Sequence, residues 1–243
     1  MFFNSFLMRP LLVLAAIGGV AAASPSAMAG PTLTIYTMSS GDPDVQKGVD
    51  GAAVTGLVNS TLTGGLPTVS AFGASYSGPS GKITDVNGSG QLNWWTPGGF
   101  VTMISSSVVT LPYDSGASFF PGGGGGDGGS AGFVTATIRG SFVAPSSGNV
   151  TLNLGSDDDA WVFIDGSLVV DNGGVHAFAV APTAVSGIAA GTHTIDVFFA
   201  DRHSVQSRLF FNADVTINAI PEPASMALLG VGLLGLRLAR RRS

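Results

Sequence analysis

The feature that most constrains this fold is a series of short segments in which apolar and polar residues alternate, separated by turns rich in glycine. In residues 208–217 the odd-numbered positions from 209 onward are apolar and share one face, which is the pattern of a half-buried strand. Residues 194–200 alternate in the same way, and residues 133–143 and 149–154 predict two further strands. No part of the central region sustains an amphipathic helix, and the best short candidate is 52–62. The sequence therefore predicts an all-β fold.

Charge in the central region is sparse and acidic. The chain has ten Lys and Arg against fifteen Asp and Glu, but five of the basic residues and only one acid, Glu222, lie in its two ends. The middle thus holds 14 acids, all of them Asp, against 5 bases, a net charge of −9. This balance argues against nucleic acid as a partner, because nucleic-acid binding requires a basic surface. The absence of cysteine excludes disulfides and thiolate metal sites.

The N-terminal end has the pattern of a secretory signal peptide. A single charge at Arg9 precedes an apolar run over 11–23, and the small-residue motif Ala27-Met28-Ala29 precedes Gly30. The alternative is a buried N-terminal helix. We expect signal peptidase to cleave after residue 29, so that residues 1–29 are absent from the mature protein.

The C-terminal end resembles the PEP-CTERM sorting signal. Pro221-Glu222-Pro223 precedes an apolar run over 224–236, which we expect to form a short helix, and the arginines Arg237, Arg240, Arg241 and Arg242 follow. The run is marginal for spanning a bilayer, which takes about 20 residues, and the arginines would stay cytoplasmic. The resemblance implies transient anchoring in the inner membrane and removal by an exosortase in a Gram-negative bacterium. A plain C-terminal anchor is the alternative. The predicted parts are thus a signal peptide (1–29), one β-domain (30–220) and a sorting signal (221–243).

Residues 155–174 predict an acidic hairpin. The strand 161–164 is apolar on both faces, and Asp165-Gly166 is a strong two-residue turn signal. With that turn, Ala160 is predicted to pair with Asp171, and Asp159 with Asn172. The hairpin would therefore gather oxygen-bearing side chains at one end, namely those of Asp157, Asp158, Asp159, Asp171 and Asn172.

Such a cluster suits a hard cation. Adjacent carboxylates repel one another unless they are well solvated or a cation neutralises them. Oxygen-only ligands favour Ca²⁺ over zinc or copper. The sequence predicts a Ca²⁺ site at this end of the hairpin, with a solvated acidic loop as the alternative.

This segment and several others are similar to the PA14 domain and its fibro-slime relatives. The matching residues are Ser156-Asp157-Asp158, Ile164-Asp165-Gly166, Val170-Asp171, Gly173-Gly174-Val175-His176, Gly56-Leu57-Val58, Trp94-Trp95, Phe119-Phe120-Pro121 and Asp201-Arg202-His203. The resemblance implies a PA14-like antiparallel β-sandwich. In PA14 adhesins of yeasts an adjacent Asp pair holds Ca²⁺, which binds sugar hydroxyls, and that pair corresponds by position to Asp157 and Asp158. The adhesins' further ligand loop has no counterpart that can be placed in this sequence.

Five other residues are candidates for ligand contact. Trp94 and Trp95 are adjacent, so on a strand they would face opposite ways and one could stack on a sugar, whereas core packing is the alternative. His176 and His203 are candidate contacts or else strand-end histidines with internal partners. Arg202 is a further candidate for ligand contact, and the alternative is that it forms an ion pair within the protein.

The predicted function is Ca²⁺-dependent binding of a carbohydrate or exopolysaccharide, or adhesion, by an exported protein of the cell surface or extracellular matrix. The alternative is a structural matrix protein whose Ca²⁺ only stabilises the hairpin. Catalysis is not expected, because the sequence has no Gly-x-Ser-x-Gly or His-Glu-x-x-His motif and no Glu in the central region.

Overall fold

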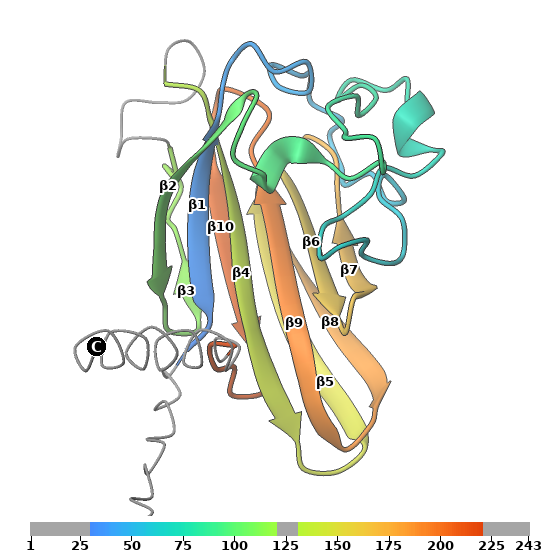
Figure 1. Ribbon diagram of the computed structural model, residues 1–243, viewed down its shortest axis with the longest axis vertical. Coiled ribbons are helices and arrows are strands. Elements are labelled where there is room, and N and C mark those ends of the chain that lie inside the picture. The colour runs from blue at the N-terminus through green and yellow to red at the C-terminus, as the bar shows by residue number, and fades with distance from the viewer. Residues whose placement is uncertain (1–29, 121–130, 221–243) are drawn as a thin grey trace, which may run out of the picture.

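The computed structural model describes residues 30–120 and 131–220, and these form an all-β domain of two antiparallel sheets (Figure 1). The predicted signal peptide and sorting helix lie outside the described residues. The larger sheet has the order β2 (Val101–Val108), β1 (Thr32–Met38), β4 (Phe133–Ala144), β9 (Gly191–Ala200), β6 (Asp159–Ile164), β7 (Ser167–Asn172). The smaller sheet has the order β3 (Tyr113–Asp114), β10 (Arg208–Ala213), β5 (Gly148–Asp157), β8 (Ala179–Ile188). The predicted antiparallel β-sandwich is confirmed.

One hydrophobic core lies between the two sheets. The alternating residues of β9, Ile195, Val197 and Phe199, are buried there together with Leu209 and Phe211 of β10. These are the residues that the alternation predicted to face inward. Apolar side chains of β4, β5 and β6 complete this core.

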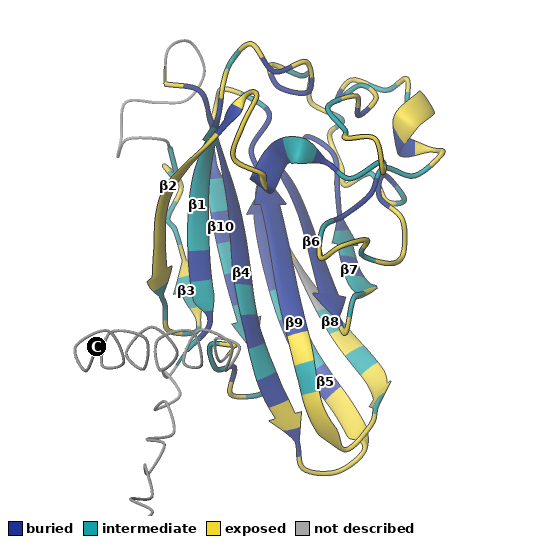
Figure 2. Cartoon of the chain, in the orientation of Figure 1, coloured by how far each residue is buried: buried dark blue, intermediate teal, exposed yellow. Residues whose placement is uncertain are grey.

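A second core lies on the other face of the larger sheet. Residues 39–100, here named the cover, pack over that face and contain two short 3₁₀ helices, η1 (Gly73–Ser75) and η2 (Asn93–Trp95). Figure 2 shows β6 and the adjoining half of β9 buried beneath the cover. Because the sheet is covered on both faces, the strand around Trp161 and Phe163 is apolar at successive positions rather than alternating. Residues 52–62, the best candidate for a helix, form turns and isolated bridges instead.

The β6–β7 hairpin has the predicted turn, and it keeps the predicted register only next to that turn, where Ile164 pairs with Ser167 and Phe163 with Leu168. Asp165 and Gly166 both have positive φ, 49° and 75°, as a type I′ turn requires. Beyond the turn, Val169 is an extra residue in β7, so Trp161 pairs with Asp171 and Ala160 with Asn172. Beyond this bulge the predicted pairing is therefore wrong by one residue. The bulge brings the Asp171 carboxylate beside the Trp161 indole on the cover side of the sheet, 2.9 Å from Nε1.

Candidate functional site

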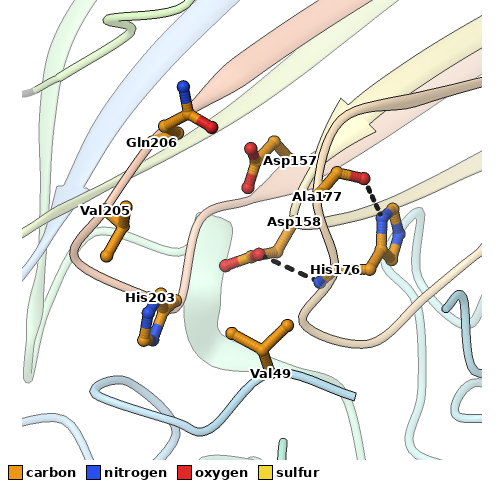
Figure 3. Close-up of a pocket in the computed structure, with 8 residues that line it drawn as sticks. All are labelled: Val49, Asp157, Asp158, His176, Ala177, His203, Val205 and Gln206. Carbon is orange, nitrogen blue, oxygen red and sulfur yellow. Dashed lines mark hydrogen bonds between the residues drawn. The ribbon is translucent and has the colours of Figure 1, made fainter. Parts of the chain in front are cut away.

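Asp157 and Asp158 lie in a pocket of about 130 Å³ where β5 passes into β6 (Figure 3). The β7–β8 loop contributes His176 and Ala177 to one wall. The β9–β10 loop contributes the opposite wall, and the cover contributes one residue of the rim. The remaining lining residues are Val49, His203, Val205 and Gln206.

The Asp158 carboxylate is held by backbone amides from both walls. Its Oδ1 accepts a hydrogen bond from the His176 amide at 3.2 Å, and its Oδ2 accepts one from the Arg202 amide at 2.8 Å. The residue is only 1% exposed. Burial, reinforced by the neighbouring Asp159 and Asp157 carboxylates, raises the pKa of Asp158 to about 8 despite the stabilising Arg202 amide.

Asp157 is also buried, and its peptide bond to Asp158 is cis. Burial raises the pKa of Asp157, against the opposing effects of hydrogen bonds and of His176 and His203. The pocket therefore presents two adjacent carboxyl groups whose charged forms are incompletely compensated by the protein. Such a pair favours binding of a proton or a cation.

Asp159 is adjacent in sequence but faces away from this pocket. Its Oδ2 lies 2.7 Å from Arg202 Nε, and both side chains are completely buried. Its Oδ1 accepts hydrogen bonds from Arg202 Nη2 and the Gly174 amide. Both carboxylate oxygens are thus occupied, which corrects the prediction that Asp159 is a metal ligand.

The same buried ion pair corrects the prediction that Arg202 contacts a ligand. Its Nη1 donates to the Ser80 carbonyl at 3.1 Å, and its guanidinium lies 5.1 Å from the centre of the Trp94 ring. The guanidinium is therefore held within the interface between the sandwich and the cover.

Asp171 and Asn172 have structural partners too. Asp171 accepts hydrogen bonds from Trp161 Nε1 and from the Gly56 amide at 2.7 Å. Asn172 Nδ2 donates to Ser156 Oγ at 2.7 Å. Neither residue lines the pocket, so the predicted five-residue cluster is not assembled. Within residues 30–120 and 131–220, no group of three or more His, Cys, Asp or Glu is arranged to hold a metal ion.

Trp94 and Trp95 belong to the second core. They lie in η2 rather than on a strand, and they are 0% and 3% exposed. Trp94 Nε1 donates to Asp44 Oδ2 at 3.1 Å, and Trp95 Nε1 donates to the Phe199 carbonyl at 2.9 Å. Neither ring can stack on a sugar in this arrangement, so that prediction is wrong and the core alternative holds.

The two predicted histidines do line the pocket, with different bonding. His176 is buried, and its Nδ1 lies 3.0 Å from the Ala177 carbonyl. His203 Nδ1 lies 2.6 Å from the Lys47 carbonyl, to which it can only donate. In the neutral ring this bond leaves Nε2 as an acceptor, and no protein donor to Nε2 occurs among the described residues.

Sequence reasoning missed Val49, Ala177, Val205 and Gln206. Gln206 had one available signal, since it follows the matched segment Asp201-Arg202-His203 at short distance in the same β9–β10 loop. Val49 had none, because only the packing of the cover brings it to the pocket.

The chain matches two family models. Residues 124–221 match the PA14 domain, and residues 219–243 match the PEP-CTERM protein-sorting motif. The first match contains every lining residue of the pocket except Val49.

Similar proteins include two from Dictyostelium discoideum. Protein psiR is 42% identical over 60 residues, which cover 24% of this chain and 6% of psiR. Protein psiE is 38% identical over 65 residues, which cover 26% of this chain and 13% of psiE. The chain therefore matches only a small part of either relative.

Similar solved structures include two PA14 domains. The PA14 sugar-binding domain from an RTX adhesin has 10% sequence identity and a TM-score of 0.39, over 78% of this chain and 91% of that one. The PA14 domain of the MpAFP antifreeze protein has 12% identity and a TM-score of 0.35, over 85% of this chain and 99% of that one. The two family models together support a PA14-like domain that is followed by a PEP-CTERM sorting motif.

Proposed function

We propose that this protein is exported to the cell surface or extracellular matrix, where it binds a neutral polysaccharide through Ca²⁺ held by Asp157 and Asp158. The observation that carries the proposal is the pair of adjacent, buried carboxyl groups lining one pocket. The match to the PA14 family supports the same location for a site.

The residues of the pocket fit a hard cation. Arg202 contributes only its backbone amide to Asp158, because its guanidinium is bound to Asp159. A divalent cation would supply the missing positive charge, and carboxylate oxygens are the ligands that Ca²⁺ prefers. The amide oxygen of Gln206, on the facing wall, would add a neutral ligand. Asp159, Asp171 and Asn172 have no part in this ligand set.

Bound Ca²⁺ would supply a centre at which water is exchanged for vicinal hydroxyl groups of a sugar. The chain's own contribution is the rim of the pocket. His203 Nε2 can accept a hydrogen bond from a hydroxyl group, and Val49 and Val205, 48% and 66% exposed, offer apolar contact for C–H groups. The net charge of −9 in the central region would repel anionic chains at long range, which favours a neutral polysaccharide.

The route to the surface follows from the sorting motif. The PEP-CTERM match supports export with processing by an exosortase, and we propose a transient inner-membrane intermediate in a Gram-negative bacterium. No helix within the described residues is long and apolar enough to cross a membrane. In this proposal, residues 221–243 provide the anchor.

A second candidate function is purely structural. Asp158 is almost completely buried, and each of its carboxylate oxygens already accepts a backbone hydrogen bond. A cation at this position could therefore join the walls of the pocket without any sugar ligand. Catalysis fits less well, because glycosidases place their two carboxyl groups on opposite sides of the scissile bond rather than on adjacent residues.

Calorimetric titration of the full chain with neutral exopolysaccharide, with Ca²⁺ and with chelator, tests the proposal. We expect binding in Ca²⁺ only, and none by Asp158→Asn. Asp214→Asn is the matched control, because Asp214 is exposed just after the end of β10, does not line the pocket and accepts one hydrogen bond from the Thr151 amide. If the protein binds Ca²⁺ but gives no signal with millimolar sugar, the structural function is supported instead. If it binds neither Ca²⁺ nor sugar, the site is refuted.

A further inference from the structure

The cover contains a second group of carboxylates that is separate from the pocket. Asp42 and Asp44 follow β1, and Asp85 approaches them from a later part of the cover. Their neighbours are Asn93 and Trp94 of η2. None of these residues lines the pocket of Asp157 and Asp158.

Asp44 is fully partnered. Its oxygens accept hydrogen bonds from the backbone amides of Thr84 and Asp85, both at 2.9 Å, from Thr84 Oγ1 at 2.9 Å and from Trp94 Nε1 at 3.1 Å. Several donors stabilise the charged form of a carboxylate. Asp44 therefore connects the start of the cover to the later segment that contains Thr84, Asp85 and Trp94. It has little capacity for a further ligand.

Asp42 differs, because one of its oxygens lacks any partner. The residue is 4% exposed, its Oδ1 accepts a hydrogen bond from the Asp44 amide at 2.7 Å, and its Oδ2 is buried without a hydrogen bond. A buried carboxylate oxygen left in this way is strongly unfavourable.

The ionised neighbours that most affect Asp42 are negative. They are Asp85 and Asp44. Burial, followed by the Asp85 side chain and the Asp44 charge, raises the pKa of Asp42 to about 7 against the lowering effect of the Asp44 amide bond. Asp85 is half-buried, and its Oδ1 accepts a hydrogen bond from Asn93 Nδ2 at 2.8 Å. The Arg202 guanidinium points Nη1 at the Asp44 carbonyl, 3.5 Å away, and is bound to Asp159.

We propose that Asp42 and Asp85 bind a second hard divalent cation, of which Ca²⁺ is the matching class, with the Asn93 side-chain amide as a neutral ligand. Among the described residues, no three or more His, Cys, Asp or Glu are arranged to hold a metal ion. The proposed site therefore depends on two carboxylates together with neutral oxygen ligands. Asn93 can present its oxygen in place of its nitrogen by a half-turn of the amide group.

Such an ion would join the start of the cover to η2. Asp42 follows the end of β1, whereas Asn93 begins the short helix that carries Trp94 and Trp95 into the second core. The cation would thereby hold the cover closed over the larger sheet. A proton shared between Asp42 and Asp85 is the competing arrangement, and it requires no metal.

Counting bound Ca²⁺ by calorimetry on the full chain separates these arrangements. With both sites present, the parent binds two equivalents, Asp158→Asn one, Asp85→Asn one, and the double variant none. If the pocket of Asp157 and Asp158 binds no ion, the parent binds one equivalent, Asp158→Asn still binds one, and Asp85→Asn binds none. The two proposals can therefore fail independently.

Asp85→Asn is preferred to a change at Asp42 because Asp85 is half-buried, and circular dichroism checks that the variant is folded. Asp214→Asn again serves as the control and should bind as many ions as the parent. In the Asp158→Asn background, Ca²⁺ should raise the melting temperature at pH 7.5. If it does not, or if Asp85→Asn binds as many ions as its parent, the second cation site is refuted.

Discussion

Arg202 and Asp159 form an ion pair in which both side chains are completely buried, with Nε 2.7 Å from Oδ2. The pair lies behind the pocket, since the backbone amide of Arg202 also donates to Asp158. The carbonyl oxygen of Arg202 accepts a hydrogen bond from the Lys47 amide of the cover. One residue thus connects the carboxyl pair, the sandwich and the cover.

Breaking this pair should be strongly destabilising. Asp159→Asn leaves the Arg202 charge buried with no anionic partner, and we expect a loss of about 3–5 kcal/mol in the free energy of unfolding, measured by urea denaturation. The double variant Asp159→Asn, Arg202→Met should recover part of that loss, because no unpaired charge then remains buried. A loss below about 1 kcal/mol for the single variant would contradict the buried pair.

The metal-free protein should lose stability as the pH rises from about 4 to 8. The pKa of Asp158 is raised from 3.8 to about 8 by burial, so the folded state binds more protons than the unfolded state in this range. Protonation then favours folding, and its contribution decreases as the pH approaches 8, by at most about 1.4 kcal/mol per pH unit for one carboxyl group. Thermal or urea unfolding in chelator measures this slope.

Asp158→Asn separates this effect from general acid sensitivity. The variant should have a shallower slope and, in chelator at pH 8, a stability equal to or above that of the parent, because it removes the buried charge. Asp214→Asn should retain the parent's slope. An unchanged slope in Asp158→Asn would show that its carboxyl group does not titrate in this range.

The pairing of His193 with Asp165 should stabilise the turn of the β6–β7 hairpin at low pH. His193 Nδ1 lies 2.6 Å from Asp165 Oδ2, and Nε2 lies 3.0 Å from the Ala189 carbonyl, so both ring nitrogens can donate only in the protonated ring. The hydrogen bond to Asp165, followed by that to Ala189, raises the pKa of His193. The stabilisation is therefore complete below the unfolded pKa of about 6.5 and is lost as the pH rises through the folded value.

Asp165→Asn should lower the pKa of His193, as followed by the NMR shift of its ring protons. Asp214→Asn is the control and should leave the pKa of His193 unchanged, because Asp214 accepts its hydrogen bond from the Thr151 amide and not from His193. If the pKa of His193 does not fall, the carboxylate of Asp165 is not responsible for raising it.

Local sequence patterns predicted the strands near β4, β5, β6, β9 and β10 and the turn after β6, because both depend on neighbouring residues, whereas β1, β2, β3 and β8 were not predicted. The alternation in β9 and β10 identified the inward-facing side chains, and Asp165-Gly166 identified a turn in which both residues have positive φ. The bulge at Val169 was not predictable in this way. It depends on how β7 meets the cover, where Asp171 finds Trp161 and Gly56 as donors.

Sequence analysis identified only part of the candidate site. Asp157 and Asp158 are adjacent, and His176 and His203 were identified from segments matched to a family. The assignment of Asp159 failed because its partner, Arg202, lies 43 residues away in sequence. The prediction that Trp94 or Trp95 is exposed failed because it assumed that the two residues lie on a strand. They lie in η2 instead, and both rings are buried in the second core.

The pocket is built from two parts of the chain that can vary separately. Its carboxylates lie where β5 passes into β6, within the region matched to the PA14 family, whereas Val49 on its rim belongs to the cover, which precedes that region. A substitution or a change of loop length near Val49 could therefore alter which ligand is accepted without disturbing a single strand pairing. Among proteins built in this way, the choice of glycan could change faster than the sequence of the β-sandwich that supports the pocket.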